Sequence, residues 1–204
     1  MTRAGAAFAL AVSGVLVCAG SSSSASVDNI VPTSNYYIGC LAGQGNGTVC
    51  QTDNATVTYY MDSGGADQLE AVDKRVVRDM LAAQYAPTDL TIKYDANPTW
   101  SGSAETDIYY SEADVPGSAT GMAWCNDVAS GYKCDQSYIR IEGGGAYSPG
   151  LTCHETGHSV GLLHGNSAYP KVDTQDGVLG CMKKRVGYSD ALGSNNRNNI
   201  NLVY

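Results

Sequence analysis

The sequence predicts one α/β (α+β) domain in which a twisted, mixed five-stranded sheet lies over a histidine-bearing helix. Three observations predict this fold class. A strand signal is followed by a helix signal and then by four more strand signals between residues 56 and 141. A second helix signal follows and leads into the segment that holds all three histidines of the chain. Beyond residue 164 the pattern is irregular until a final helix signal at 192–204, so we expect a small irregular C-terminal subdomain ending in a helix.

The individual elements follow from residue type and spacing. The first strand, 56–61, is rich in β-branched and aromatic residues. A helix is expected at 66–85 because its apolar residues recur at helical spacing, and Pro87 ends it. The other four strands are the short runs at 90–94, 107–110, 121–124 and 137–141.

Residues 1–26 have the features of a secretory signal peptide. A positive start at Arg3 precedes an apolar run from Ala6 to Val17 and a serine-rich stretch that ends at Ser26. The apolar run is too short to span a bilayer. We therefore expect a secreted, extracellular protein with no transmembrane segment, cleaved near residue 26. Lipidation at Cys18 is an alternative, although valine is a poor residue before a lipidated cysteine.

Charge limits the partners of the mature chain. Removal of Arg3 leaves 11 basic against 20 acidic side chains, a formal net charge of −9. An acidic chain without a basic stripe is a poor match for nucleic acid. The length of 204 residues allows one domain with a tail. We expect a monomer that binds no nucleic acid.

Six of the seven cysteines follow the signal peptide. An even number in an exported chain predicts three disulfides, and six cysteines allow fifteen pairings. There is no C-x-x-C pair, which argues against a thiol redox site. The pairing of nearest neighbours in sequence is Cys40–Cys50, Cys125–Cys134 and Cys153–Cys181.

The segment 27–54 is polar and rich in Gly, Ser, Thr and Asn. We expect it to lie on the surface, held by Cys40–Cys50, and it is too short for a folded propeptide. Residues 55–204 then form the folded domain. Asp and Asn are plentiful in the loops, but no calcium-loop spacing occurs, so structural Ca²⁺ is without support.

Residues 154–164 read H-E-x-x-H-x-x-G-x-x-H. On a helix, His154 and His158 lie one turn apart on the same face. Gly161 falls where the helix should stop, and glycine tolerates the backbone turn that brings His164 towards the other two. Three converging neutral imidazoles form a Zn²⁺ site with an open fourth position.

Glu155 completes the motif. It lies beside the open position, where a carboxylate can take a proton from bound water. A structural zinc would need four protein ligands, and the chain has no fourth histidine. Cys153 points about 100° away from the first histidine on a helix. The helix is expected to start at Ser148, with proline at the first helical position.

The motif resembles that of the metzincin clan of zinc endopeptidases, and the chain looks most like small secreted bacterial members and the matrixin catalytic domain. The resemblance covers most of residues 55–204. It implies a metalloendopeptidase that hydrolyses polypeptides with Glu155 as general base. It also places Met182 in the methionine turn beneath the zinc, although an ordinary core methionine is the alternative. Gly165 stands where clan members carry a family-marking residue, which leaves the subfamily open.

The resemblance implies further roles around the cleft. Residues 121–124 match the edge strand that binds the peptide, with a plain structural strand as the alternative. The pairing Cys153–Cys181 would hold Met182 under the zinc helix, unless Cys153 pairs elsewhere. Tyr188 could supply a hydrogen bond or be a core tyrosine. The wall of the specificity pocket is expected between His164 and Tyr188, where Tyr169, Pro170 and Val178 are candidates.

A hypothesis from a different class is a secreted zinc-binding module without peptidase activity, built on the same scaffold. Glu155 argues against it, because metal retention needs the histidines but not the glutamate. Cys40 could hold the zinc in a latent form, but its neighbours do not match the switch motif of matrixins.

Overall fold

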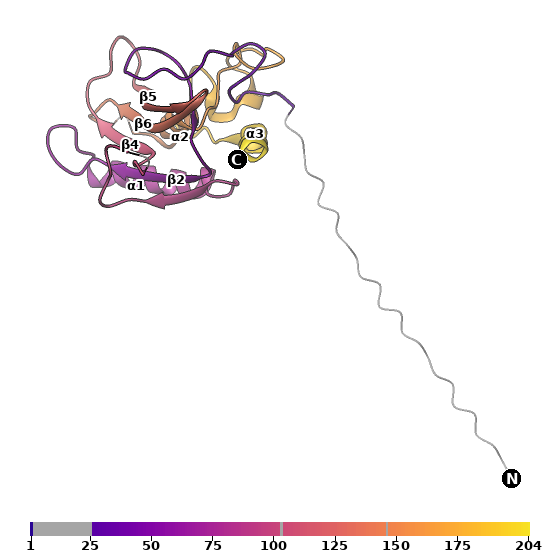
Figure 1. Ribbon diagram of the computed structural model, residues 1–204, viewed down its shortest axis with the longest axis horizontal. Coiled ribbons are helices and arrows are strands. Elements are labelled where there is room, and N and C mark those ends of the chain that lie inside the picture. The colour runs from indigo at the N-terminus through magenta and orange to yellow at the C-terminus, as the bar shows by residue number, and fades with distance from the viewer. Residues whose placement is uncertain (2–25, 103, 146) are drawn as a thin grey trace.

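The computed structural model describes Met1 and residues 26–204 except residues 103 and 146 (Figure 1). The expected signal peptide therefore lies almost entirely outside the described residues. In the part of the chain that is described, no helix is both long and apolar enough to cross a membrane.

A mostly parallel sheet crosses the domain, and it has six strands rather than the five expected. β6 (Lys133–Ile141) pairs in parallel with β4 (Ile108–Glu112) and β1 (Gln51–Thr52) and in antiparallel fashion with β5 (Gly121–Ser130). β4 continues in parallel to β2 (Thr56–Met61) and then to β3 (Thr91–Tyr94). The expectation of a mixed sheet is confirmed by the single antiparallel pair.

The extra strand and the longer hairpin have a common cause. β1 has two residues, too few to show the alternation that marks a strand in sequence. β5 and β6 reach beyond 121–124 and 137–141 to form a hairpin closed at Gly131, which has a positive φ of 58°. Few of the added residues are β-branched or aromatic, so their pairing rather than their type reveals them as strands.

Helix α1 (Ala71–Met80) begins later than the expected residue 66 and continues through a π-helical turn, η1 (Leu81–Tyr85). The amide of Leu69 instead donates to the carbonyl of Asp62, so the chain between them forms a turn. The C-terminal half of the helix supplies the core, with Val77 and Tyr85 fully buried.

Helix α2 (Pro149–Ser159) lies at the centre of the molecule (Figure 1). The hydroxyl of Ser148 accepts from the amide of Leu151 at 3.2 Å, which confirms the predicted N-cap. Residues 150–157 are all buried, including polar ones that find partners. The hydroxyls of Tyr110 and Thr156 lie 2.8 Å apart, and Tyr85 donates to the carbonyl of Cys153 at 2.6 Å.

The segment 27–54 is not a surface segment throughout. Val31 is fully buried, and Ile30 forms an isolated bridge with Leu162. The amide of Asn195 donates to the carbonyl of Val27 at 2.9 Å. Residues 27–31 are thus clamped between the chain after α2 and the helix α3 (Gly193–Val203), by polar contacts that leave no periodic signal. Residues 37–39 and 41–47 are mostly exposed, as expected.

All three predicted disulfides are present. The Cα–Cα distances are 5.4 Å for Cys40–Cys50, 5.7 Å for Cys125–Cys134 and 6.1 Å for Cys153–Cys181. The third joins α2 to a 3₁₀ turn, η2 (Gly177–Met182), within the irregular segment before α3. Covalent cross-links of this number are typical of proteins from oxidising compartments.

Candidate metal centre

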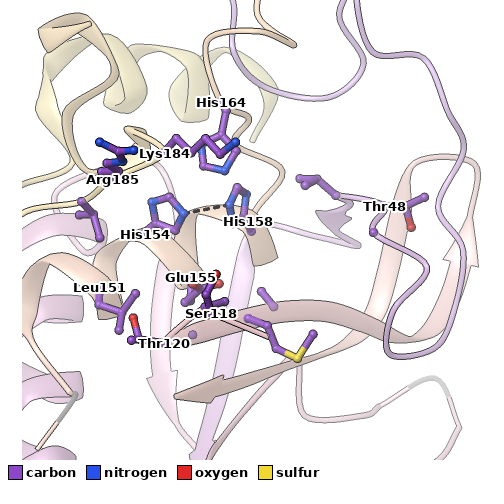
Figure 2. A pocket seen from close by; sticks show the side chains of 17 residues that line it. Thr48, Ser118, Thr120, Leu151, His154, Glu155, His158, His164, Lys184 and Arg185 are labelled. Atoms are coloured by element: carbon purple, nitrogen blue, oxygen red, sulfur yellow. Dashed lines mark hydrogen bonds between the residues drawn. The ribbon is translucent and has the colours of Figure 1, made fainter. Parts of the chain in front are cut away.

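The structure brings the three histidines together around one point. The Nε2 atoms of His154 and His158 lie 3.2 Å apart. The ring of His164 has its centroid 5.0 Å from that of His154 and 4.8 Å from that of His158. One ligand nitrogen from each ring lies within 4.8 Å of the other two. Figure 2 shows the first two rings on α2 and the third entering from the chain beyond it.

A glycine makes this convergence feasible. Gly161 has a φ of 94°, a conformation that other residues rarely adopt. A Cβ at this position would also lie 2.9 Å from Cγ of Gln51. The reversal is closed by the amide of Leu162, which donates to the carbonyl of Gly157 at 2.8 Å. The predicted turn after α2 is therefore present, and it delivers His164.

Backbone carbonyls orient all three rings. His154 Nδ1 lies 2.7 Å from the carbonyl oxygen of Cys181, and His164 Nδ1 lies 2.9 Å from that of Met182. His158 Nδ1 lies 2.9 Å from the carbonyl oxygen of Leu162. A carbonyl oxygen only accepts, so each Nδ1 carries the hydrogen and each Nε2 keeps a free lone pair.

Burial keeps the rings neutral. Desolvation, followed by the neighbouring His164, lowers the pKa of His154 to about 4. Desolvation also lowers the pKa of His158 well below its usual range. The pKa of His164 is lowered chiefly by burial and further by the positive charge of Lys184. Neutral imidazoles are the form that binds a metal.

This donor set fits Zn²⁺. Three imidazole nitrogens with an open fourth position form a tetrahedral catalytic site, and imidazole is a ligand that zinc prefers. All three Nδ1–H groups have the carbonyl partners that metal-binding histidines usually have. The assignment of the three residues as ligands stays a prediction supported by this geometry.

Glu155 lies on the same helix and lines the same cavity. Its carboxyl fits against β5, where a Cβ on Gly121 would lie only 2.8 Å from Oε1. Burial raises the pKa of Glu155 to about 8. A cation bound beside the carboxyl would lower this pKa and favour the carboxylate that a general base requires.

Met182 packs against α2, the helix that carries His154 and His158. Its side chain is fully buried, and a Cβ on Gly157 would overlap with its sulfur atom. The disulfide of Cys181 with Cys153 ties this residue to α2. The carbonyls of Cys181 and Met182 are also the partners of two histidine rings. This short segment thus supports the site by packing, by a covalent bond and by hydrogen bonds.

A cavity of about 520 Å³ opens above the histidines and Glu155 (Figure 2). One wall is the start of β5 with the turn before it, and the opposite wall is the segment 184–186. Gly47, Thr48 and Val49 of the N-terminal segment complete the lining. The sequence placed a wall between His164 and Tyr188 without singling out 184–186, and it did not place residues 47–49 at the site, because they arrive there through tertiary contacts.

Several expectations about the cleft need correction. Tyr169, Pro170 and Val178 do not line the cavity, because the chain between His164 and Tyr188 presents residues 184–186 instead. The side chain of Tyr188 is 72% exposed and does not line the cavity either.

The structure also explains two residues near the cleft. Gly165 leaves space that a Cβ would take from the carbonyls of Val172 and Asp173, at 2.7 Å each. Trp124 is buried beside Tyr138, so this last residue of the expected peptide-binding strand packs within the protein. Residues 121–123 of the same strand line the cavity.

A second group of three candidate ligands consists of Glu70, Asp73 and Glu112, whose carboxylate oxygens lie within 4.8 Å of one another. We call it the acidic cluster. Glu70 is exposed, whereas Asp73 is buried. Burial, followed by Glu70 and Glu112, raises the pKa of Asp73 to about 7.

Comparison with known proteins gives no family assignment. No protein-family model matches the chain, and no curated protein matches it.

Proposed function

We propose that the chain is a secreted zinc endopeptidase of the metzincin type, with His154, His158 and His164 as ligands and Glu155 as general base. The observation that carries the proposal is the orientation of the three rings. Their carbonyl-bonded Nδ1 atoms turn three neutral Nε2 lone pairs towards one open point, and a carboxyl group lies beside it.

The chemistry follows from this arrangement. Zinc, when bound, lowers the pKa of a bound water towards about 7 and polarises the substrate carbonyl. Glu155 would take up a proton from the attacking water and pass it to the leaving amine. The cavity keeps the carboxyl largely out of bulk solvent, so proton transfer stays within the site.

The substrate in this proposal is an extended polypeptide. β5 pairs with β6 along one side only, and residues 121–123 face the cavity on the other. Strand addition to this edge supplies main-chain hydrogen bonds that do not depend on sequence. The amide of Gly43 donates to the carbonyl of Cys125 at 2.8 Å, so the N-terminal segment already uses the edge beyond residue 124.

A zinc-binding module without activity is the second candidate. It would need the histidines and their carbonyl partners but neither a buried glutamate nor a cleft beside an accessible strand edge. Both features are present, which favours the peptidase.

The deciding experiment is hydrolysis of casein by the purified mature chain. Activity should disappear on treatment with a chelator and return when one equivalent of zinc is added. Full activity of the metal-free protein would contradict the proposal, and zinc binding without hydrolysis would favour the inactive module.

A further inference from the structure

The wall of the cleft opposite β5 carries two adjacent cations, Lys184 and Arg185. Figure 2 shows Lys184 beside His164 and Arg185 on the same side of the cleft, above His154. Both side chains are exposed. The chain has 20 acidic and 12 basic side chains, so its composition does not by itself lead one to expect two neighbouring cations at the candidate active site.

Neither cation forms an ion pair with an acidic side chain among the described residues. Lys183, the first residue of the basic run, forms an ion pair with Asp190 at 2.8 Å. Among the described residues this is the one ion pair, so Lys184 and Arg185 are both left without one. Their charge is therefore available to a ligand in the cleft.

The backbone holds the two cations close to the histidines. The amide of Lys184 donates to the carbonyl of Thr174 at 2.9 Å. Two residues earlier, the carbonyl of Met182 is the partner of His164. The same short stretch therefore orients a candidate zinc ligand and presents the two charges on the adjacent wall.

The other residues that line the cavity carry little negative charge that would repel an anionic ligand. The three histidines are neutral, and Glu155, turned towards β5, is the one acidic side chain that lines the cavity among the described residues. Leu151 and Val186 are apolar and pack near the same wall. An extended peptide lying along β5 would direct alternate side chains towards 184–186.

We propose that Lys184 and Arg185 select polypeptides carrying a glutamate or aspartate next to the scissile bond, on the side of the cleft formed by residues 184–186. This inference rests on the proposed peptidase function, because it assigns the substrate class of that site. Exposed ion pairs are individually weak. Because both cations lie on one wall of the cleft, a glutamate carboxylate beside them should be preferred to a glutamine amide by about tenfold in kcat/KM.

The test uses the zinc-loaded mature chain and a set of peptides with one central cleavable bond. A single glutamate is moved through three positions on either side of that bond, and each peptide has matched glutamine and lysine versions. One position should show the roughly tenfold preference for glutamate, and the preference should shrink as salt is raised. Equal cleavage of glutamate and glutamine peptides at every position would overturn the inference.

Variants can distinguish the effect of Lys184 and Arg185 from the effect of the protein's net charge. Lys184→Gln/Arg185→Gln should abolish the preference, and Lys184→Glu/Arg185→Glu should reverse it in favour of lysine peptides. The control is Lys74→Gln/Lys93→Gln, which makes the same change of net charge on α1 and β3, outside the cavity lining, and should leave the preference unchanged. A preference that survives in the first variant would overturn the inference.

A binding measurement keeps this inference separate from the peptidase proposal. In the Glu155→Gln protein, fluorescence anisotropy of labelled peptides should show tighter binding of the glutamate peptide, and the Lys184/Arg185 variants should remove the difference. If no peptide is cleaved, the peptidase proposal fails, but this binding difference still supports an acidic ligand. Equal binding, or no binding of either peptide, would overturn the inference.

Discussion

Apart from cysteines that are already disulfide-bonded, two groups of three candidate metal ligands lie among the described residues, and they differ in hydrogen bonding and in charge. The ligand atoms of the three histidines lie within 4.8 Å of one another, and so do those of the acidic cluster, Glu70, Asp73 and Glu112. Each histidine ring has its Nδ1 held by a backbone carbonyl. The acidic cluster instead gathers like charges, one of them on an exposed side chain.

Electrostatics shows the difference in another way. Burial lowers the pKa values of the histidines, so the rings are neutral and can approach without repulsion. In the acidic cluster, burial raises the pKa of Asp73 to about 7, and the neighbouring carboxylates of Glu70 and Glu112 contribute in the same direction. Closeness of ligand-type side chains is therefore weak evidence for a metal site. The outer hydrogen bonds that orient and neutralise the ligands are the stronger evidence.

The largest expected effect comes from removing a ligand. His164→Ala should lower zinc affinity by more than the roughly 10–100-fold that loss of an outer partner costs, and activity should fall with it. Helical content by circular dichroism should stay near wild type, because His164 lies beyond the end of α2. Glu70→Gln/Glu112→Gln is the matched control, with zinc content unchanged. Unaltered zinc occupancy in His164→Ala would place the third ligand elsewhere.

Glu155→Gln should separate catalysis from metal binding. The substitution keeps the shape of the side chain but removes the proton acceptor, so we expect a rate loss of at least ~100-fold in peptide hydrolysis. Zinc measured by atomic absorption should remain at one equivalent. Glu112→Gln, which changes a glutamate of the acidic cluster, should hydrolyse peptides at the wild-type rate. Loss of zinc from Glu155→Gln would reveal a structural part for this residue.

The contribution of residues 181–182 to the histidine site can be tested by removing the disulfide Cys153–Cys181. Cys153→Ser/Cys181→Ser opens a loop with a sequence separation of 28 residues. Loop-closure entropy predicts a loss of about 3–4 kcal/mol in the free energy of unfolding, measured in urea. Zinc affinity should also fall, since the carbonyls of Cys181 and Met182 orient two rings.

Cys40→Ser/Cys50→Ser is the control for that experiment. It should also destabilise the protein, but its zinc affinity should be unchanged, because this disulfide supplies no partner to the histidines. An equal loss of zinc affinity in both variants would argue against specific support by residues 181–182.

The smallest expected effect concerns the acidic cluster. The pKa of Asp73 rises from 3.8 to about 7 on folding, so the folded state binds the proton more tightly. The stability it contributes is present below pH 3.8 and is lost as the pH rises through about 7. Asp73→Asn cannot ionise, so the variant should not lose this stability as the pH rises. Its unfolding midpoint should match wild type near pH 4 and exceed it progressively up to pH 7, and a constant difference would contradict the pKa shift.

Local chemistry allowed much of the fold and the candidate site to be predicted. The spacing of His154 and His158 on one helix face, the reversal at Gly161 and the cap at Ser148 each depend on a few neighbouring residues. The strong strand signals and the disulfides Cys40–Cys50 and Cys125–Cys134, with sequence separations of 10 and 9, are local in the same sense. These predictions agree with the structure because short-range geometry leaves few alternatives.

Only the tertiary structure decided the rest. The two-residue β1 exists because β6 lies beside it, and Val27 and Asn29 are buried because α3 supplies asparagine partners. Cys181 and Met182 orient the rings through backbone carbonyls, which every residue possesses and no sequence pattern marks. Lys184 and Arg185 face the cleft because of contacts between segments distant in sequence. By itself, the sequence determined which groups could do the chemistry, and long-range packing determined what surrounds and orients them.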